Sequence, residues 1–122
     1  MRLDEITRPE LSEVERFANK LWSKVGIEFE FTVHFFDRLN DQRNGKPIAV
    51  SELVRLLKKE YESYGKQIAK LDDRSVAIMR DLTTQINLPF LIRDTEVGKT
   101  VVAKSIIRKS NYHTAGQEFS VK

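Results

Sequence analysis

The stretch Ile27-Glu-Phe-Glu-Phe-Thr-Val33 decides the fold, because its apolar residues are spaced differently from those before it. Apolar and polar residues alternate here, as in a strand with one buried face. From about Glu10 to Val25, apolar residues instead recur at intervals of three and four, as on one side of a helix. Gly26 separates the two patterns and can adopt the left-handed conformation that ends helices. The sequence therefore predicts a helix that ends at Gly26 and a strand that follows it directly.

The flanking residues predict where the helices begin and end. Thr7-Arg-Pro-Glu10 fits the capping box that opens a helix. Thr32 is placed to cap a second helix, which the turn-forming Asn44-Gly-Lys-Pro47 ends. Ser51 opens the strongest helical pattern of the chain, and Gly65 is its expected end.

Strand-forming residues dominate the last part of the chain. Asn87–Arg93 fits a strand, Thr100–Arg108 is rich in β-branched residues, and Glu118–Val121 follows as a further short strand. Val76–Leu82 is ambiguous, because its pattern fits either a helix or a strand. We therefore expect an antiparallel sheet in this part of the chain.

These patterns together predict an α+β fold, with N-terminal helices packed on a C-terminal antiparallel sheet of about four strands. The length of 122 residues suits a single domain, and no internal repeat or long linker divides it. The domain would comprise an N-terminal helix (1–26), a segment with a His/Arg motif and a second long helix (27–66), and the antiparallel sheet (67–122).

The composition excludes several kinds of chemistry. The chain has no cysteine, which rules out disulfides, thiol catalysis and thiolate metal sites. His34, His113 and carboxylates are the remaining metal ligands, and we expect neither a metal nor another cofactor. With 40% hydrophobic and 32% charged residues, and neither a membrane-spanning apolar run nor a signal-peptide core, we expect a soluble intracellular protein without a membrane partner.

Positive charge is concentrated at the C-terminal end of the chain. The formal net charge is +3, yet Lys99–Lys122 carries five Lys or Arg residues against one acidic residue. The rest of the chain is therefore close to neutral. Such a basic segment suits an anionic partner, most often one with phosphate groups, but a lysine-rich solvated sheet face would give the same count.

The segment His34–Arg43 concentrates a titratable imidazole, two guanidiniums and two carboxylates. On a helix His34 and Arg38 share a face, so a base and a phosphate-binding group would meet on one surface. A plainer interpretation is a partly buried histidine beside a solvated charged face. Asp37 and Asp41 also share a face and could bind magnesium, but carboxylates beside arginines more often form ion pairs.

Short motifs from this segment to the end of the chain follow a definite order. They are His34-Phe-Phe-Asp-Arg38, Asn40-Asp41, Arg43-Asn-Gly-Lys-Pro-Ile48, Asn87-Leu-Pro-Phe90, Lys99-Thr-Val-Val102 and Ile107-Arg-Lys109. In this order and spacing they resemble a family of small tailed-phage proteins, which is similar in its predicted fold to the barnase, EndoU, colicin RNase and RelE superfamily. The resemblance covers the chain from about residue 27 to its end. It implies a nuclease-like domain in which N-terminal helices precede a roughly four-stranded antiparallel sheet that holds an RNase site.

The resemblance implies metal-independent cleavage of RNA. Such a reaction needs a base for the ribose 2′-hydroxyl, cations for the phosphate and an acid for the leaving oxygen. His34 would serve as base or acid, and Arg38 and Arg43 match the arginine positions of the family and would bind phosphate oxygens. On the late strand, Lys104 and Arg108 would share one face, because side chains alternate along a strand, and both would point at the phosphate.

Other residues would contact the nucleic acid without reacting. Lys109 and Thr114 match the C-terminal polar pattern of the family, Lys46 lies in the predicted tight turn, and Tyr112 could stack on a base. Tyr112 and His113 stand where other members often carry a phenylalanine and a lysine. His113 would therefore be either the second histidine of an acid and base pair or simply an exposed loop residue.

Three functions of different classes fit these residues. The first is a phage-encoded ribonuclease of the host cytoplasm, which requires an exposed His34 in a basic cleft with at least two of Arg38, Arg43, Lys104 and Arg108 nearby. The second is a non-catalytic protein that binds RNA or another nucleic acid, with the histidine buried or paired away from any cleft. The third is a structural or interaction protein of a phage virion, with a large exposed apolar patch that contacts other phage proteins.

Overall fold

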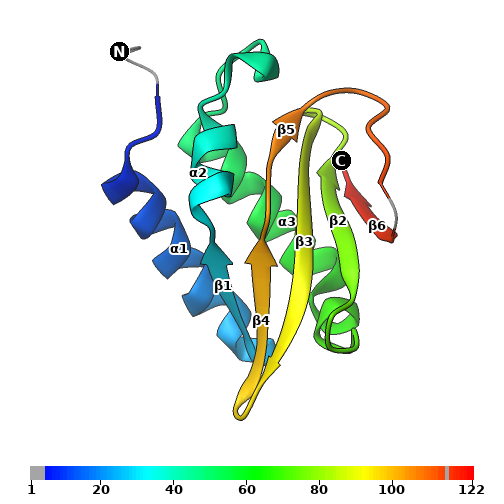
Figure 1. The fold of residues 1–122 in the computed structure, drawn as a ribbon. Helices are drawn as coiled ribbons and strands as arrows, with labels where there is room; N and C mark the ends of the chain where they lie inside the picture. The colour runs from blue at the N-terminus through cyan, green and yellow to red at the C-terminus, as the bar shows by residue number, and fades with distance from the viewer. Residues whose placement is uncertain (1–4, 115) are drawn as a thin grey trace.

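The computed structural model, which describes residues 5–114 and 116–122, places two long helices on one side of a mixed sheet (Figure 1). The helices are α1 (Arg8–Trp22), α2 (Val33–Leu39) and α3 (Val50–Ala69), with 3₁₀ turns at Ser23–Val25 and Gln42–Asn44. The strands are β1 (Ile27–Phe31), β2 (Val76–Asp81), β3 (Ile86–Thr95), β4 (Gly98–Ala103), β5 (Ile107–Arg108) and β6 (Gln117–Val121). The α+β fold expected from the sequence is confirmed.

The sheet itself differs from the predicted antiparallel sheet of about four strands. It has six strands in the described part of the chain, in the order β1-β4-β3-β2-β6, with β5 paired to β3. β1 pairs with β4 and β6 with β2 in parallel, whereas the pairs that involve β3 are antiparallel. The strand at Ile27–Phe31 belongs to this sheet and lies at its edge. The chain leaves β1 through α2 and α3 before it returns to the sheet, and such a long crossover permits parallel pairing.

Helix α1 begins with the predicted capping box, but it ends at Trp22, and a 3₁₀ turn fills the three residues before the predicted Gly26. The Thr7 hydroxyl accepts a hydrogen bond from the Glu10 backbone N–H (3.3 Å), and the Glu10 carboxylate accepts one from the Thr7 N–H (2.9 Å), which completes the capping box. After a 3₁₀ turn, Gly26 adopts a left-handed φ of 77°. The apolar side of α1, including the fully buried Trp22, packs against β1 and α3.

Helix α3 begins before the expected cap and continues past the expected end. The Glu52 carboxylate accepts a hydrogen bond from the Ala49 backbone N–H (2.9 Å) at its start, so Ser51 is not the cap. The helix also runs through Gly65 without a break. Gly65 allows close packing, because a Cβ there would lie 3.2 Å from the Tyr61 ring.

The ambiguous segment Val76–Leu82 contains β2, which lies in the interior of the sheet between β3 and β6. Residues 77 to 81 are all buried, so no alternation of polar and apolar residues marks the strand. Two of these buried residues, Arg80 and Asp81, are charged. The continuous burial explains why the pattern fitted two kinds of element equally well.

Helices α1 and α3 cover one face of the sheet and leave the other face, here termed the open face, without a helix (Figure 1). α1 packs against β1, and α3 packs against β2 and β6. The core between these layers holds its largest side chains fully buried, among them Trp22, Phe35, Phe90 and Phe119. Among the described residues, no helix combines the length and apolar character needed to cross a membrane.

Candidate functional site

Helix α2 carries the predicted His/Arg motif beside the end of β4. The Thr32 hydroxyl accepts a hydrogen bond from the Phe35 backbone N–H (3.0 Å) and donates one to the Ala103 carbonyl (3.3 Å). The first bond confirms the predicted cap, and the second fixes the start of α2 against β4. Phe35 is fully buried, whereas the preceding residue, His34, is exposed. Packing of the aromatic side chain thus keeps the imidazole at the surface.

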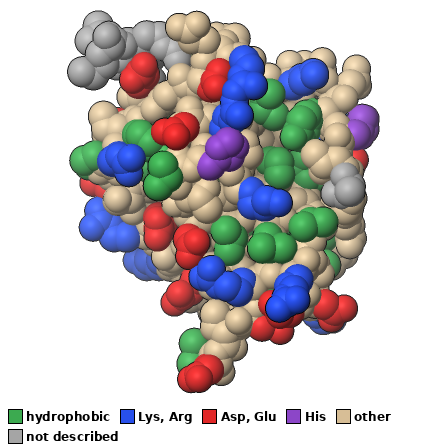
Figure 2. Space-filling model, in the orientation of Figure 1, with side chains coloured by type: hydrophobic (Ala, Val, Ile, Leu, Met, Phe, Trp, Pro, Cys, Tyr) green, Lys and Arg blue, Asp and Glu red, His purple; other side chains and the backbone are tan. Residues whose placement is uncertain are grey.

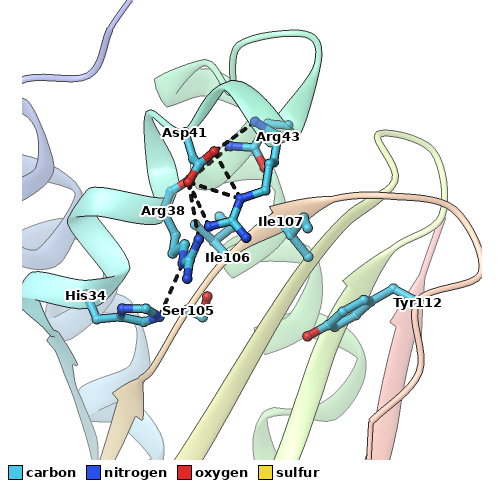
Figure 3. Close-up of a pocket in the computed structure, with 9 residues that line it drawn as sticks. His34, Arg38, Asp41, Arg43, Ser105, Ile106, Ile107 and Tyr112 are labelled. Atoms are coloured by element: carbon cyan, nitrogen blue, oxygen red, sulfur yellow. Dashed lines mark hydrogen bonds and ion pairs between the residues drawn. The ribbon is translucent and has the colours of Figure 1, made fainter.

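Four side chains of this segment are linked to one another (Figure 3). The Arg38 Nε donates a hydrogen bond to His34 Nε2 (3.3 Å), and Arg38 Nη1 lies 3.2 Å from Asp41. Arg43 Nη2 lies 3.1 Å from the same carboxylate, which also accepts the Arg43 backbone N–H (2.8 Å). The shared face of His34 and Arg38 is therefore confirmed. Asp41 forms the expected ion pairs, but it lies beyond the end of α2 and so does not share a helical face with Asp37.

This arrangement leaves donors and positive charge available for an anion. Two guanidiniums share one carboxylate, so Arg38, Asp41 and Arg43 together carry a net positive charge. Within the described part of the chain, Arg38 Nη2 and Arg43 Nη1 make no hydrogen bond. The planar guanidinium suits pairs of phosphate oxygens. Because His34 Nε2 accepts a hydrogen bond, the neutral ring carries its proton on Nδ1 in this geometry.

Two adjoining clefts lie beside these side chains. The arginine cleft, of about 210 Å³, is lined by His34, Arg38, Asp41, Arg43, Asn44, Ser105, Ile106, Ile107 and Tyr112. The sheet cleft, of about 630 Å³, is lined by Thr32, His34, Val76, Ala77, Pro89, Phe90, Lys104, Ser105, Tyr112 and Thr114. The two clefts share His34, Ser105 and Tyr112. Figure 2 shows this face, with a histidine near its middle, Lys and Arg side chains on either side of it, and hydrophobic side chains alongside.

Lys104 and Arg108 do not share a face, contrary to the prediction. The register of β4 on β3 and that of β5 on β3 differ by one residue, so the segment between them accommodates one residue more than its partner strand. An extra residue of this kind shifts the alternation of side chains, as in a β-bulge. Lys104 consequently lines the sheet cleft, and Arg108 contacts α3 on the other side of the sheet. The same shift brings Ser105 to both clefts and buries Ile106.

Arg108 forms bonds within the protein instead of lining a cleft. Its guanidinium donates to both carboxylate oxygens of Glu52 (2.7 and 3.0 Å) and to the carbonyls of Pro47 (2.9 Å) and Thr84 (2.8 Å). The side chain is 10% exposed. The hydrogen bond from Arg108 holds the pKa of Glu52 below its usual value, although partial burial of the carboxylate opposes this. Arg108 therefore joins the turn before α3 to β5.

The remaining predicted contact residues lie in different places. Thr114 lines the sheet cleft, whereas the exposed Lys46 and Lys109 line neither cleft. His113 Nδ1 lies 3.0 Å from Glu118, and His113 also lies outside both clefts. The interaction with His113 is the main cause that lowers the pKa of Glu118. The prediction of a histidine pair across one cleft is therefore not supported by this geometry.

Two buried polar residues that the sequence patterns missed hold Tyr112 in place. Arg80 donates to the Tyr112 backbone carbonyl, to Asn87 Oδ1 (2.9 Å) and to the Glu118 carboxylate (2.6 Å). Asn87 Nδ2 donates to the Lys109 carbonyl (2.9 Å). These bonds attach the segment between β5 and β6 to the sheet at two points, Lys109 and Tyr112, on either side of residues 110 and 111. The available signal was Arg80, a charged residue that directly follows the four apolar residues 76–79 of the strand.

Asn44 is a third residue whose role the sequence did not indicate. It is buried, its Nδ2 donates to the Arg38 carbonyl (2.9 Å), and its Oδ1 accepts the Arg108 backbone N–H (3.0 Å). One side chain thus connects the end of α2 to β5. Residues of both elements line the arginine cleft, so this side chain ties together two segments that form it.

The described residues contain no group of three His, Cys, Asp or Glu side chains that could hold a metal ion. Comparison with protein-family models, curated proteins and solved structures gives no match. The function is therefore argued from the two clefts and the residues that line them.

Proposed function

We propose that this protein is a ribonuclease-like enzyme that binds the RNA backbone in the arginine cleft and cleaves it without a metal. The observation that carries this proposal is the contact between the exposed His34 and Arg38 in the arginine cleft. Arg43, which lines the same cleft, forms an ion pair with Asp41, as Arg38 also does. A base and two phosphate-binding groups then lie on one concave surface. This is the combination that transfer of a phosphoryl group to a neighbouring hydroxyl requires.

The proposed reaction is attack of the ribose 2′-oxygen on the adjacent phosphorus. Arg38 Nε gives up its hydrogen bond to His34 Nε2 and donates to the phosphate instead, and the freed Nε2 takes the proton of the 2′-hydroxyl as the new O–P bond forms. The bond from phosphorus to the 5′-oxygen breaks, and that oxygen takes a proton from solvent on the open side of the cleft. Arg38 and Arg43 neutralise the charge that develops on the non-bridging phosphate oxygens. The products are a 2′,3′-cyclic phosphate and a 5′-hydroxyl end.

RNA binding without cleavage is the second candidate, and two observations favour it. In this structure the lone pair of His34 Nε2 accepts the hydrogen bond from Arg38 Nε, so this nitrogen is not free to take a proton. His113 is paired with Glu118 and lies outside both clefts, so it does not supply a second imidazole to the arginine cleft. Under this alternative the protein retains a salt-dependent affinity for RNA but does not cleave it.

Cleavage assays in EDTA separate the two candidates. Wild type should cleave single-stranded RNA, His34→Gln should lose about a hundredfold or more in rate, and Arg38→Lys should lose about a hundredfold. Arg16→Lys is the matched control, because Arg16 is 76% exposed on α1 and pairs only with Glu13 among the described residues. Equal rates in wild type and His34→Gln would contradict the proposal. Binding without cleavage would identify the second candidate.

The phage origin, the location in the host cytoplasm and a role among virion proteins stay predictions from the resemblance. The virion alternative predicts a stable complex with other phage proteins. Pull-down from infected cells, with wild type and a variant of the arginine cleft, would test it.

A further inference from the structure

The sheet cleft differs in character from the arginine cleft beside it. Its volume of about 630 Å³ falls within the range of small-molecule sites. Its surface combines the apolar side chains of Val76 and Pro89 with the ring of Tyr112. Val76 is 44% exposed, although it is a large apolar residue. This cleft therefore offers an apolar, partly aromatic surface to a ligand.

A planar heteroaromatic group suits this surface better than a phosphate or a sugar does. Apolar walls gain free energy by covering a flat, weakly hydrated ring, and a tyrosine ring can stack on its face. Lys104 also lines this cleft, and its ammonium can reach the edge of such a ring. Phosphates instead prefer the guanidiniums of the neighbouring cleft.

The order of the groups across both clefts matches the order within a nucleotide. Arg38 and Arg43 line only the arginine cleft, His34 and Ser105 line both clefts, and Val76 and Pro89 line only the sheet cleft. A phosphate, a ribose and a base follow one another in the same sequence. The ribose would then lie next to His34, where its 2′-hydroxyl has to be.

We propose that the sheet cleft is a nucleobase site that accepts one unpaired base, so that the substrate is single-stranded RNA. This inference rests on the proposed function of the arginine cleft. A base within a duplex is stacked and paired, and it enters a pocket only after it leaves the helix. The sheet cleft therefore selects the strand state of the substrate, while the arginine cleft binds its backbone.

The structure holds Tyr112 ready for this role. Its backbone carbonyl accepts a hydrogen bond from the buried Arg80, and the preceding Asn111 adopts a left-handed φ of 56°. Asparagine tolerates that conformation better than most residues. Figure 3 shows the hydroxyl end of the Tyr112 side chain turned toward His34 and Ser105. A backbone fixed in advance reduces the entropy that is lost when a base binds.

The test is a binding cycle with an uncleavable probe, a single-stranded 2′-O-methyl RNA oligonucleotide, with and without a single abasic position. Fluorescence anisotropy with wild type, Tyr112→Ala and Tyr112→Phe gives the affinities. Tyr112→Ala should fold normally, because the hydrogen bond to Arg80 uses the backbone carbonyl, which the substitution retains. Circular dichroism of each variant checks this.

Wild type should bind the intact single strand about tenfold more tightly than the abasic strand or a duplex of the same sequence. That preference should disappear in Tyr112→Ala and persist in Tyr112→Phe. Equal affinity for intact and abasic strands, or no binding of any probe, would overturn the base site. Cleavage of natural RNA is measured separately. Cleavage together with equal affinity for intact and abasic strands would leave the proposed function intact and overturn the base site. Weaker binding of the abasic strand without any cleavage would support the base site alone.

Discussion

Replacement of Glu60 by glutamine should remove much of the pH dependence of folding stability above about pH 5. Glu60 lies on α3 and is fully buried, and in the described part of the chain neither of its carboxyl oxygens has a hydrogen-bond partner. Burial raises the pKa of Glu60 from 4.5 to about 9. The nearby backbone N–H of Arg80 offsets part of this shift, and the negative charge of Asp81 adds to it. The folded protein therefore holds this carboxyl group protonated at neutral pH.

The sign and size of the effect follow from proton linkage. Because the pKa is higher in the folded state, the unfolded chain releases this proton first, and the free energy of unfolding falls as the pH rises from 4.5 toward about 9. The slope is about 1.4 kcal/mol per pH unit, so wild type should lose about 3 kcal/mol between about pH 5 and pH 7. Glutamine has nearly the same volume and does not titrate. The variant should therefore be more stable than wild type at neutral pH.

Urea denaturation followed by circular dichroism, repeated over this pH range, measures the effect. The two proteins differ only at residue 60, so the difference between their pH profiles isolates the effect of Glu60. Glu62→Gln is the control, because Glu62 is exposed on the same helix and its replacement should preserve the wild-type slope. Parallel pH profiles for wild type and Glu60→Gln would refute the reasoning.

Four further substitutions test other parts of the structure. Arg108→Met should lower the free energy of unfolding by on the order of 3 kcal/mol in urea denaturation, because Glu52 would be left partly buried without its partner. Since the pKa of Glu52 is lowered in the folded state, its stabilising effect is lost as the pH falls, and Glu52→Gln should flatten the acid side of the stability profile. Gly98→Ala should cost about 1–3 kcal/mol, since the new Cβ would overlap the Gly26 carbonyl oxygen; unchanged stability would contradict that packing. Arg80→Lys should weaken RNA binding about fivefold and speed proteolysis between β5 and β6. A rate of proteolysis equal to that of wild type would count against the anchoring role of Arg80.

Local features of the fold were predictable because they depend on neighbouring residues. The capping box at Thr7 and the cap at Thr32 each need a side chain and a backbone group within three residues. The left-handed Gly26 and the buried face of α1 follow from the same short-range rules. The contact between His34 and Arg38 was predictable in the same way, as a pair four residues apart on a helix.

Features that depend on pairing between distant segments were not predictable. The extra residue between β4 and β5 can be recognised only from the register of both strands with β3. This extra residue places Lys104 and Arg108 on different faces of the sheet. The parallel position of β1 likewise depends on a partner far along the chain. A glycine at position 65 favours a helix end, but the helix continues, and the glycine is explained by the close Tyr61 ring, which leaves little room for a Cβ. The anchoring role of Arg80 depends on three partners from three segments.

The central claim is that the arginine cleft cleaves RNA by way of the ribose 2′-hydroxyl, with His34 as the base. The most direct measurement is mass spectrometry of the products formed in EDTA from an RNA oligonucleotide and from the same oligonucleotide carrying 2′-deoxy substitutions. Wild type should release 2′,3′-cyclic phosphate and 5′-hydroxyl ends, with no cut at a 2′-deoxy position and almost none by His34→Gln. Products with 5′-phosphate ends, cuts at 2′-deoxy positions or undiminished cleavage by His34→Gln would contradict the account.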